Sequence, residues 1–437
     1  MIKILVIGSG AREHAIIQSL YKSSKKKTIY CLGTNNNPGI DEYCSELLVK
    51  NINDPEVVKS YAKEKKINFA IIGPENPLAN GIVDALLDIG IHSIGPKKEL
   101  AQIETSKSFT RNLLTTYKIP GTPKFKVFNT MNGVDDFLSV LGENYVIKYD
   151  GLAGGKGVKV AGDHLKSHKE AKQYCQELID KGGSFVIEKK LIGEEFSLMS
   201  FCDGNSLTHM PAVQDHKRAF EDDTGPNTGG MGTYSDSDHS LPFLDDNHIK
   251  AAKNINERTA KALKEKFGEG YKGVLYGGFI ATIDGVYLIE YNARFGDPEA
   301  MNVLSILETD FIDICQSIIE ENLHQIKINF SNQATVCKYA VPEGYPDNPV
   351  KNKQLDISKV KNKDNLYYAS VELKNNELFG LGSRSVAIIG TGDAIWEAEE
   401  IAENEISKVK GPVFHRKDIG TTKLLQKKIN NMASLKW

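Results

Sequence analysis

The stretch from residue 285 to residue 299, GVYLIEYNARFGDPE, limits the fold of this chain more than any other. It follows the apolar run 277–283 across Asp284-Gly285, a residue pair typical of two-residue β-hairpin turns. The pair predicts two antiparallel strands. Because side chains alternate between the two faces of a strand, the prediction places three residues on one face: Leu288, Glu290 and Asn292.

Two of these residues, Glu290 and Asn292, indicate a metal site. Positions two apart on a strand are separated by roughly 6.6 Å, so the tips of a carboxylate and an amide can converge on one cation. Oxygen ligands suit Mg²⁺, which takes its remaining ligands from water and substrate phosphates. Arg294 follows in a loop with Gly296 and Pro298, where a guanidinium can clamp a transferring phosphoryl group. An amphipathic strand with polar edge residues is the alternative, and the attached loop favours the site.

Length and composition exclude several classes of protein. The 437 residues predict two to four domains. The 54 basic and 57 acidic residues give a formal net charge of -3, which argues against a general nucleic-acid or anionic-membrane binder. The six cysteines form no C-x-x-C pair, which is typical of reduced thiols in a cytoplasmic protein. Since no stretch approaches the roughly 20 apolar residues of a membrane span, no membrane partner is expected.

The first part of the chain predicts a Rossmann-like, parallel-sheet domain. The apolar run 2–7 ends at Gly8-Ser9-Gly10 and leads into a helix. The third glycine of a G-x-G-x-x-G fingerprint would fall at Glu13, so the fingerprint is incomplete and NAD is discounted. Amides at a helix N-terminus still form an anion site. Gly10 and Arg12 are therefore predicted to bind a substrate anion.

A second strand of the same sheet, 68–72, ends in the residues GPENP. Ligands in open α/β sheets lie outside the carboxyl ends of the strands, so this turn and Gly8–Arg12 would share one rim. Glu75 could accept hydrogen bonds from a ribose diol, with Asn76 beside it. The alternative is an ordinary capped turn, because Gly, Pro and Asn are common turn residues.

A glycine-rich segment, 150–157, lies between two predicted strands of a compact α+β unit. Such a loop is mobile, and its amides can wrap phosphate oxygens. Its spacing does not match the P-loop pattern GxxxxGK[ST]. A plain flexible hairpin is the alternative. The residues predicted to meet ATP phosphates here are Lys148, Gly154, Gly155, Lys156 and Gly157.

The segment 188–195, EKKLIGEE, predicts a hinge that reads adenine through backbone groups, Lys189 included. Glu188 could take the exocyclic amine and Glu195 a ribose hydroxyl. From the letters alone, ordinary surface acids fit equally well.

A polar segment runs from Gln214 to Gly232 and shows no helix or strand pattern. Long irregular loops in compact domains are uncommon and usually functional. Lys217 and Arg218 suit a phosphate. The candidate substrate contacts in the second half are Asp223, Pro226, Asn227, Thr228, Gly229, Gly230 and Met231. The region 331–437 predicts further strands and a helix with a mostly structural role.

Taken together, these motifs resemble the glycinamide ribonucleotide synthetase family of ATP-grasp carboxylate–amine ligases. The resemblance covers essentially the whole chain, from GSGAREHA through GLAGGKGV and DTGPNTGGMG to LIEYNARFGDPE and RKDIG. It implies an α/β and α+β multidomain fold in three parts. These are a Rossmann-like domain (1–103), an ATP-grasp domain (104–330) with an inserted nucleotide lid at about 123–192, and a small mixed C-terminal domain (331–437). Ala11 and Lys190 depart from the family's usual residues.

The resemblance implies that glycine is joined to 5-phosphoribosylamine, with ATP as cosubstrate and Mg²⁺ or Mn²⁺, through a glycyl phosphate. This would be the second step of de novo purine synthesis, in the cytoplasm, with no nucleic-acid partner and with transient contacts to neighbouring pathway enzymes. Catalytic roles fall to Asp215, Lys217 and Arg294, and metal binding to Glu290 and Asn292. The implied ATP contacts are Lys107, Lys148, Lys156, Glu188, Leu191 and Glu195.

Three other functions remain open from the sequence. The first is another ATP-grasp ligase with a different acid or nucleotide amine. The second is a nucleotide-binding dehydrogenase, which rests only on Gly8–Gly10. The third is a non-catalytic nucleotide sensor, which would keep the adenine hinge but need not keep Glu290, Asn292 and Arg294. Formation of ADP and phosphate would separate a ligase from the others.

Overall fold

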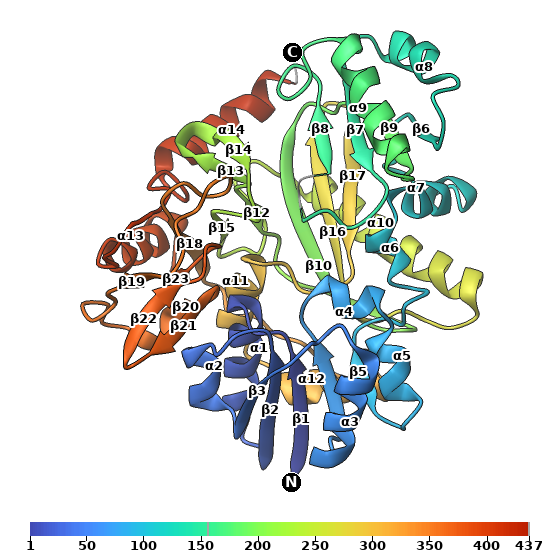
Figure 1. Ribbon diagram of the computed structural model, residues 1–437. Helices are drawn as coiled ribbons and strands as arrows, with labels where there is room; N and C mark the ends of the chain where they lie inside the picture. Colours follow the sequence, from blue (N-terminus) through green and yellow to red (C-terminus); the bar gives the residue numbers. More distant parts are fainter. Residues whose placement is uncertain (155–156, 436–437) are drawn as a thin grey trace.

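The computed structural model describes residues 1–154 and 157–435. A parallel five-stranded sheet of order β3-β2-β1-β4-β5 opens the chain, as predicted (Figure 1). Its strands are β1 (Ile2–Ile7), β2 (Lys27–Gly33), β3 (Glu46–Val49), β4 (Phe69–Ile72) and β5 (His92–Ile94). The helices around it are α1 (Ala11–Tyr21), α2 (Pro38–Tyr43), α3 (Pro55–Lys65), α4 (Glu75–Ala79) and α5 (Ile82–Leu87). The short helix α4 begins inside the segment that the sequence predicted as a turn.

A second sheet, antiparallel and of order β11-β10-β16-β17, carries the predicted hairpin. Its strands are β10 (Glu194–Asp203), β11 (Leu207–His209), β16 (Lys272–Thr282) and β17 (Gly285–Asn292). Helix α10 (Asp246–Phe267) packs on one face of this sheet. The other helices of this part are α6 (Gln102–Thr105), α7 (Lys107–Thr116), α11 (Glu299–Ser305) and α12 (Phe311–Ile319).

The hairpin contains a β-bulge that corrects the predicted side-chain alternation. Glu290 pairs with Gly278 and Leu288 pairs with Phe279, so Ile289 is the extra residue. Leu288 therefore shares the α10 face with Tyr291, whose hydroxyl hydrogen-bonds Thr259 of α10. The prediction that Leu288 lies on the same face as Glu290 and Asn292 is wrong.

The predicted lid is a separate unit at the top of Figure 1. Its sheet, of order β6-β9-β7-β8, is formed by β6 (Phe125–Phe128), β7 (Tyr145–Tyr149), β8 (Val158–Val160) and β9 (Phe185–Lys189). Helices α8 (Val134–Leu141) and α9 (His168–Asp180) accompany it. Phe128, Ile147 and Phe185 belong to an apolar core of its own.

The segment 214–232 is more ordered than the sequence predicts. It contains β12 (Gln214–Asp215) and a small hairpin of β13 (Arg218–Phe220) and β14 (Thr224–Asn227), joined by the 3₁₀ turn η1 (Glu221–Asp223). Strands of two to four residues are too short to show a hydrophobic period, which is why the segment was expected to be irregular.

The C-terminal sheet begins before residue 330. Its order is β12-β15-β18-β23-β20, with β24 also paired to β18. The strands are β15 (Gly232–Ser235), β18 (Ala334–Pro342), β20 (Leu366–Tyr368), β23 (Val386–Gly392) and β24 (Val413–Phe414). A smaller sheet holds β19 (Lys353–Leu355), β21 (Val371–Lys374) and β22 (Glu377–Gly380). The remaining elements are η2 (Leu323–Gln325), η3 (Lys363–Asn365), α13 (Ile395–Ile406) and α14 (Thr422–Ser434).

The stretch 366–374 holds two separate short strands, β20 and β21. Gly390-Thr391-Gly392 lies inside β23.

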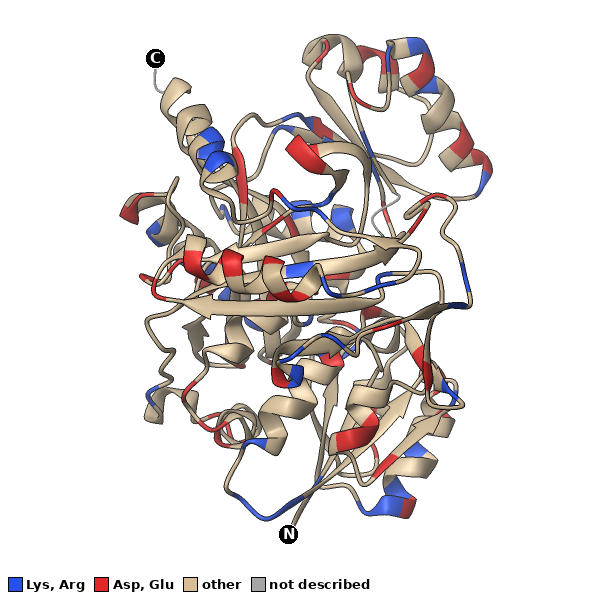
Figure 2. Cartoon of the chain, turned by 90° about the vertical axis from the view of Figure 1, so that its left-hand side faces the viewer, with Lys and Arg blue, Asp and Glu red and all other residues tan. Residues whose placement is uncertain are grey.

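Charged residues of both signs are interspersed along the chain (Figure 2), in keeping with its nearly balanced composition. Across the part that the structure describes, no helix is long and apolar enough to cross a membrane.

Candidate active site

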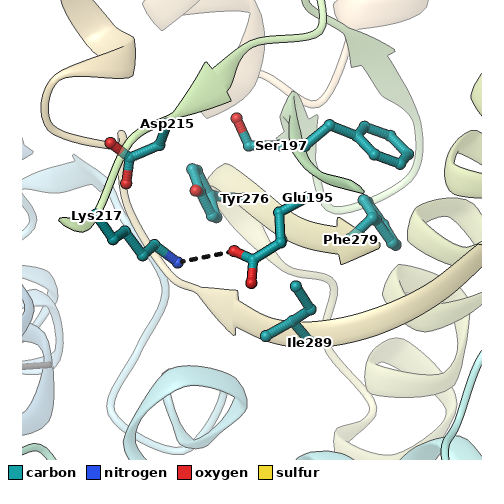
Figure 3. A pocket seen from close by; sticks show the side chains of 9 residues that line it. Glu195, Ser197, Asp215, Lys217, Tyr276, Phe279 and Ile289 are labelled. Carbon is teal, nitrogen blue, oxygen red and sulfur yellow. Dashed lines mark ion pairs between the residues drawn. The ribbon is translucent and has the colours of Figure 1, made fainter. Parts of the chain in front are cut away.

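The centre of the site is a pocket between β10, β12, β16 and β17 (Figure 3). Lys217 Nζ lies 3.9 Å from Glu195 Oε2 and 3.9 Å from Glu290 Oε1. Burial alone would lower the pKa of Lys217, but Glu195 and Glu290 outweigh burial and raise it. Lys217 is therefore a fixed positive charge. The pocket is lined by Glu195, Phe196, Ser197, Asp215, Lys217, Tyr276, Gly278, Phe279 and Ile289.

Asp215 stands at one side of this pocket with a buried carboxylate. Its Oδ1 atom has no hydrogen-bond partner among the described residues. Burial, reinforced by Glu299, raises the pKa of Asp215 well above its usual value. Glu299 itself accepts a hydrogen bond of 2.8 Å from the Tyr276 hydroxyl. Gly230 has a φ of +108°, and a Cβ there would lie 2.7 Å from Asp215 Oδ1, so only glycine fits beside this carboxylate.

The predicted metal ligands lie at the edge of the same pocket. Burial would raise the pKa of Glu290, but Lys217, Lys107 and Lys148 outweigh burial and keep it lowered, so the carboxylate is ionised. Gly278 pairs with Glu290 and has no side chain, so this position of β16 does not cover the Glu290 carboxylate. In residues 1–154 and 157–435, no group of three or more His, Cys, Asp or Glu forms a cage for a metal ion. The chemistry fits an ion that takes two protein oxygens and fills its shell with water and phosphate oxygens.

Arg294 connects β17 to the first domain. Its Nη2 atom donates to Asn292 Oδ1 at 3.1 Å and lies 3.2 Å from Glu104 Oε1. Its Nε atom is 3.7 Å from Glu75 Oε2. Burial would raise the pKa of Glu75, but Arg294 and Arg12 outweigh burial and lower it. The structure thus brings Glu75 close to the end of β17 through Arg294, with Asn76 exposed beside it.

The glycine turn after β1 is occupied by Glu13. This carboxylate accepts from the Gly10 amide at 2.6 Å and pairs with Arg12 Nε at 2.6 Å. A Cβ on Gly8 or Gly73 would collide with Glu13, at 2.8 Å and 2.0 Å from its atoms. The predicted anion site at the Gly10 amide is therefore wrong, because the protein fills it itself. The same carboxylate stands where a dinucleotide pyrophosphate would bind, which removes the basis for a dehydrogenase.

The residues predicted to contact ATP lie in the lid and in the elements next to it. Lys107 Nζ donates to the Gly151 carbonyl at 2.9 Å. Lys148 pairs with Glu188. The Glu188 carboxylate, expected to take an adenine amine, is instead held by Arg111 and Lys148. Gly154 has a left-handed φ of +54°, Gly157 lies just before β8, and Gly155 and Lys156 lie outside the described residues. Lys189 ends β9, and Leu191 follows in the hinge before β10.

Two predicted substrate contacts serve instead to hold the polar segment in place. Arg218 pairs with Asp163 of the lid at 2.8 Å. Asp223 pairs with Arg416 at 2.9 Å and with Lys428 at 2.8 Å. Pro226 and Asn227 lie in β14, Thr228 donates to the Lys217 carbonyl, and Met231 is fully buried.

The C-terminal region contributes directly to the site, which the sequence prediction missed. Arg384 Nη1 donates to the carbonyls of Gly229, Gly230 and Asp297, at 2.7, 3.2 and 2.9 Å. Its Nη2 atom lies 3.1 Å from Asp297 Oδ2, and its guanidinium stacks 4.5 Å from the centre of the Tyr339 ring. Arg384 therefore joins the loop beside Asp215 to the loop after β17.

The lid, the central antiparallel sheet and the lysines around an E-x-N strand define the chain as an ATP-grasp ligase. Family models agree over nearly the whole length. The phosphoribosylglycinamide synthetase N domain matches residues 2–104, the ATP-grasp (A) domain residues 105–300 and the C domain residues 335–422. The chain belongs to the phosphoribosylglycinamide synthetase family, and it is an ATP-dependent ligase.

Individual relatives support this placement. The phosphoribosylamine–glycine ligase of Methanosarcina barkeri is 48% identical over 434 residues, covering 99% of this chain and 100% of the relative. That of Methanocaldococcus jannaschii is 48% identical over 444 residues, with coverage of 99% and 100%. The crystal structure of phosphoribosylamine–glycine ligase from Thermotoga maritima has a TM-score of 0.80 at 28% identity, covering 96% of this chain and 100% of that one.

Proposed function

We propose that this chain joins glycine to 5-phosphoribosylamine, forming glycinamide ribonucleotide, ADP and phosphate. The names of its relatives and its family support this reaction. The observation that carries the proposal is the pocket between Asp215 and Lys217. The ammonium group of glycine can bind the Asp215 oxygen that has no partner among the described residues, and the glycine carboxylate can bind Lys217. The adjacent Glu290 is the predicted metal ligand, so that carboxylate would face the ATP phosphates.

The mechanism follows from these charges. The glycine carboxylate attacks the γ-phosphorus of ATP, ADP leaves, and a glycyl phosphate forms. The neutral amine of phosphoribosylamine then attacks the acyl carbon, phosphate leaves with the bonding electrons, and the nitrogen loses one proton to the departing phosphate. Lys217 has a raised pKa, so it stays protonated and neutralises the phosphoryl oxygens. Glu290 and Asn292 would hold Mg²⁺ or Mn²⁺, which supplies further charge neutralisation when bound.

Phosphoribosylamine is assigned to the rim that carries Glu75, Asn76 and Arg12. Glu75 is ionised and faces Arg294, so it can accept hydrogen bonds from the ribose diol next to the reacting carbon. With glycine assigned to the pocket of Asp215 and Lys217, the acyl phosphate would form between the two substrates. A cytoplasmic location belongs to the same proposal, supported by six cysteines that form no disulfide. Transient contacts to neighbouring pathway enzymes are proposed with it.

A product analysis with labelled glycine tests the reaction. With ATP, phosphoribosylamine and glycine carrying ¹⁸O in its carboxylate, one labelled oxygen should appear in the released phosphate. ADP formation should require both glycine and phosphoribosylamine. Unlabelled phosphate, or AMP with pyrophosphate, would show that no glycyl phosphate forms. ADP formation with another acid in place of glycine would favour a related ligase.

A variant at the rim tests the assignment of phosphoribosylamine. Glu75→Gln should raise the KM for phosphoribosylamine by about tenfold to a hundredfold, because a charged hydrogen bond is worth roughly 1.5–3 kcal/mol. The KM for ATP should stay unchanged, since the lid is built from other residues. Glu99→Gln, an exposed acid of the same domain, is the matched control. Steady-state kinetics with each substrate varied in turn would decide, and a raised KM for ATP alone would contradict the assignment.

A further inference from the structure

Arg111, on α7, has a buried guanidinium between the lid and β17. Its Nε and Nη2 atoms donate to the two oxygens of Glu188 on β9, at 2.8 and 3.2 Å. Its Nη1 and Nη2 atoms donate to the carbonyls of Leu288 and Ile289 on β17, each at 2.9 Å. One side chain thus joins three elements that are far apart in the sequence.

The two carbonyls belong to the bulge that directs Glu290 into the site. Ile289 is the bulged residue, and its carbonyl also accepts from Lys148 Nζ at 3.0 Å. A bulge leaves backbone groups without a strand partner, and buried groups of this kind need another donor. Arg111 is the donor for both carbonyls. It therefore fixes the backbone immediately before Glu290.

The charges around Glu188 point to a second role. Its buried carboxylate is shared by Arg111 and Lys148, and Lys148 is also a predicted phosphate contact. When Lys148 turns to ATP phosphates, Glu188 loses one of its two cations. Leaving a buried charge without any partner is strongly unfavourable. With Arg111 in place, the carboxylate stays paired and Lys148 is free to move.

We propose that Arg111 is a positioning residue for ATP, which keeps Glu188 paired while Lys148 transfers to the phosphates. The inference rests on the proposed ATP site. Loss of Arg111 should lower the affinity for ATP, because Glu188 then retains Lys148. If Glu188 carries no charge, the same loss should matter little for binding.

A double-mutant cycle tests this coupling. The variants are Arg111→Met, Glu188→Gln and the two combined. Binding of a non-hydrolysable ATP analogue with Mg²⁺ is measured by calorimetry, without glycine or phosphoribosylamine. Arg111→Met should weaken binding at least about tenfold in the presence of Glu188, and less than about threefold in the Glu188→Gln background. Equal losses in both backgrounds would overturn the proposal. Arg258→Met, which removes an exposed arginine bonded to the end of α7, is the control for a purely structural effect.

Two further variants of Arg111 complete the test. Arg111→Lys retains a cation for Glu188 but cannot reach both carbonyls, so it should bind the analogue within about threefold of the parent and turn over at least about tenfold more slowly. If Arg111→Met does not fold, Arg111→Gln, which also removes the cation, takes its place in the cycle with the same expected losses, and a binding defect that Glu188→Gln leaves unchanged would again overturn the proposal. Binding is measured without glycine and phosphoribosylamine, so it does not depend on the proposed reaction. If the protein shows the coupling but forms no glycinamide ribonucleotide, the proposed reaction is refuted and the role of Arg111 is not.

Discussion

Glu290→Gln should lower kcat by at least about a hundredfold, which corresponds to roughly 2.7 kcal/mol of transition-state stabilisation. The reason is the position of Glu290 on the bulged strand, beside Lys217 and two residues from Asn292. An amide keeps the shape but lacks the charge that a divalent cation requires. The fold should survive, because Glu290 faces the pocket and not the apolar core.

Initial rates over a range of magnesium concentrations would measure this effect. Asp284→Asn is the matched control, since it makes the same chemical change in the exposed turn of the same hairpin. The control should turn over normally. If Glu290→Gln reached near-normal turnover at saturating magnesium, Glu290 would not be a metal ligand.

Asp215→Asn should lower kcat/KM for glycine by about a hundredfold or more. This is close to the free energy lost when a charged group in a binding site loses its partner. The glycine ammonium, which would hold Asp215 in its ionised form when bound, would lose this partner. The KM for ATP should change little, because the ATP phosphates are assigned to other residues. A normal kcat/KM for glycine in this variant would show that the ammonium binds elsewhere.

The same variant should gain stability when no substrate is present. Since burial raises the pKa of Asp215 above its unfolded value, the folded state prefers the protonated form. The resulting stabilisation is present below the unfolded pKa near 4 and is lost as pH rises through the folded pKa. At pH 7 to 8, Asp215→Asn should therefore unfold at a higher temperature than the parent, and the difference should vanish at low pH.

Asp223→Asn provides a control of opposite sign for the stability measurement. Burial would raise the pKa of Asp223, but surrounding cations, among them Lys428 and Arg416, outweigh burial and lower it. Its stabilisation is present above the unfolded pKa and is lost as pH falls. Asp223→Asn should thus lower the melting temperature at neutral pH. Equal shifts in both variants would contradict the assigned environments.

The sequence predicted features that depend on neighbouring residues along the chain. The hairpin at Asp284-Gly285, the strands of the lid and the E-x-N strand all follow from local patterns, and the structure contains them. The bulge at Ile289 is different, because it arises from the register with β16. Nothing in the alternation of β17 alone shows it.

The residues that were missed are brought to the site by topology. Glu104 and Arg384 lie in stretches without a motif, and Arg111 ends the motif SKSFTR, in which it was given no role. Each reaches its partner across more than 70 positions of the chain. Glu13 is a partial exception. The missing third glycine was visible in the sequence, but only the crowding at Gly8 and Gly73 shows that a carboxylate fills the crevice.

The C-terminal sheet contains strands from both sides of residue 330, and this limits which parts of the site can move. Strand β15 pairs with β18 through four residues on each side, so the loop beside Asp215 is tied by backbone hydrogen bonds to the C-terminal region. The lid has its own core and is joined to the body by the chain before β6 and before β10 and by the pairs Arg111–Glu188 and Arg218–Asp163. The part of the site assigned to glycine is thus held by a continuous sheet. A closing movement over ATP would bend the two chain connections, carry or break these pairs, and leave the glycine subsite where it is.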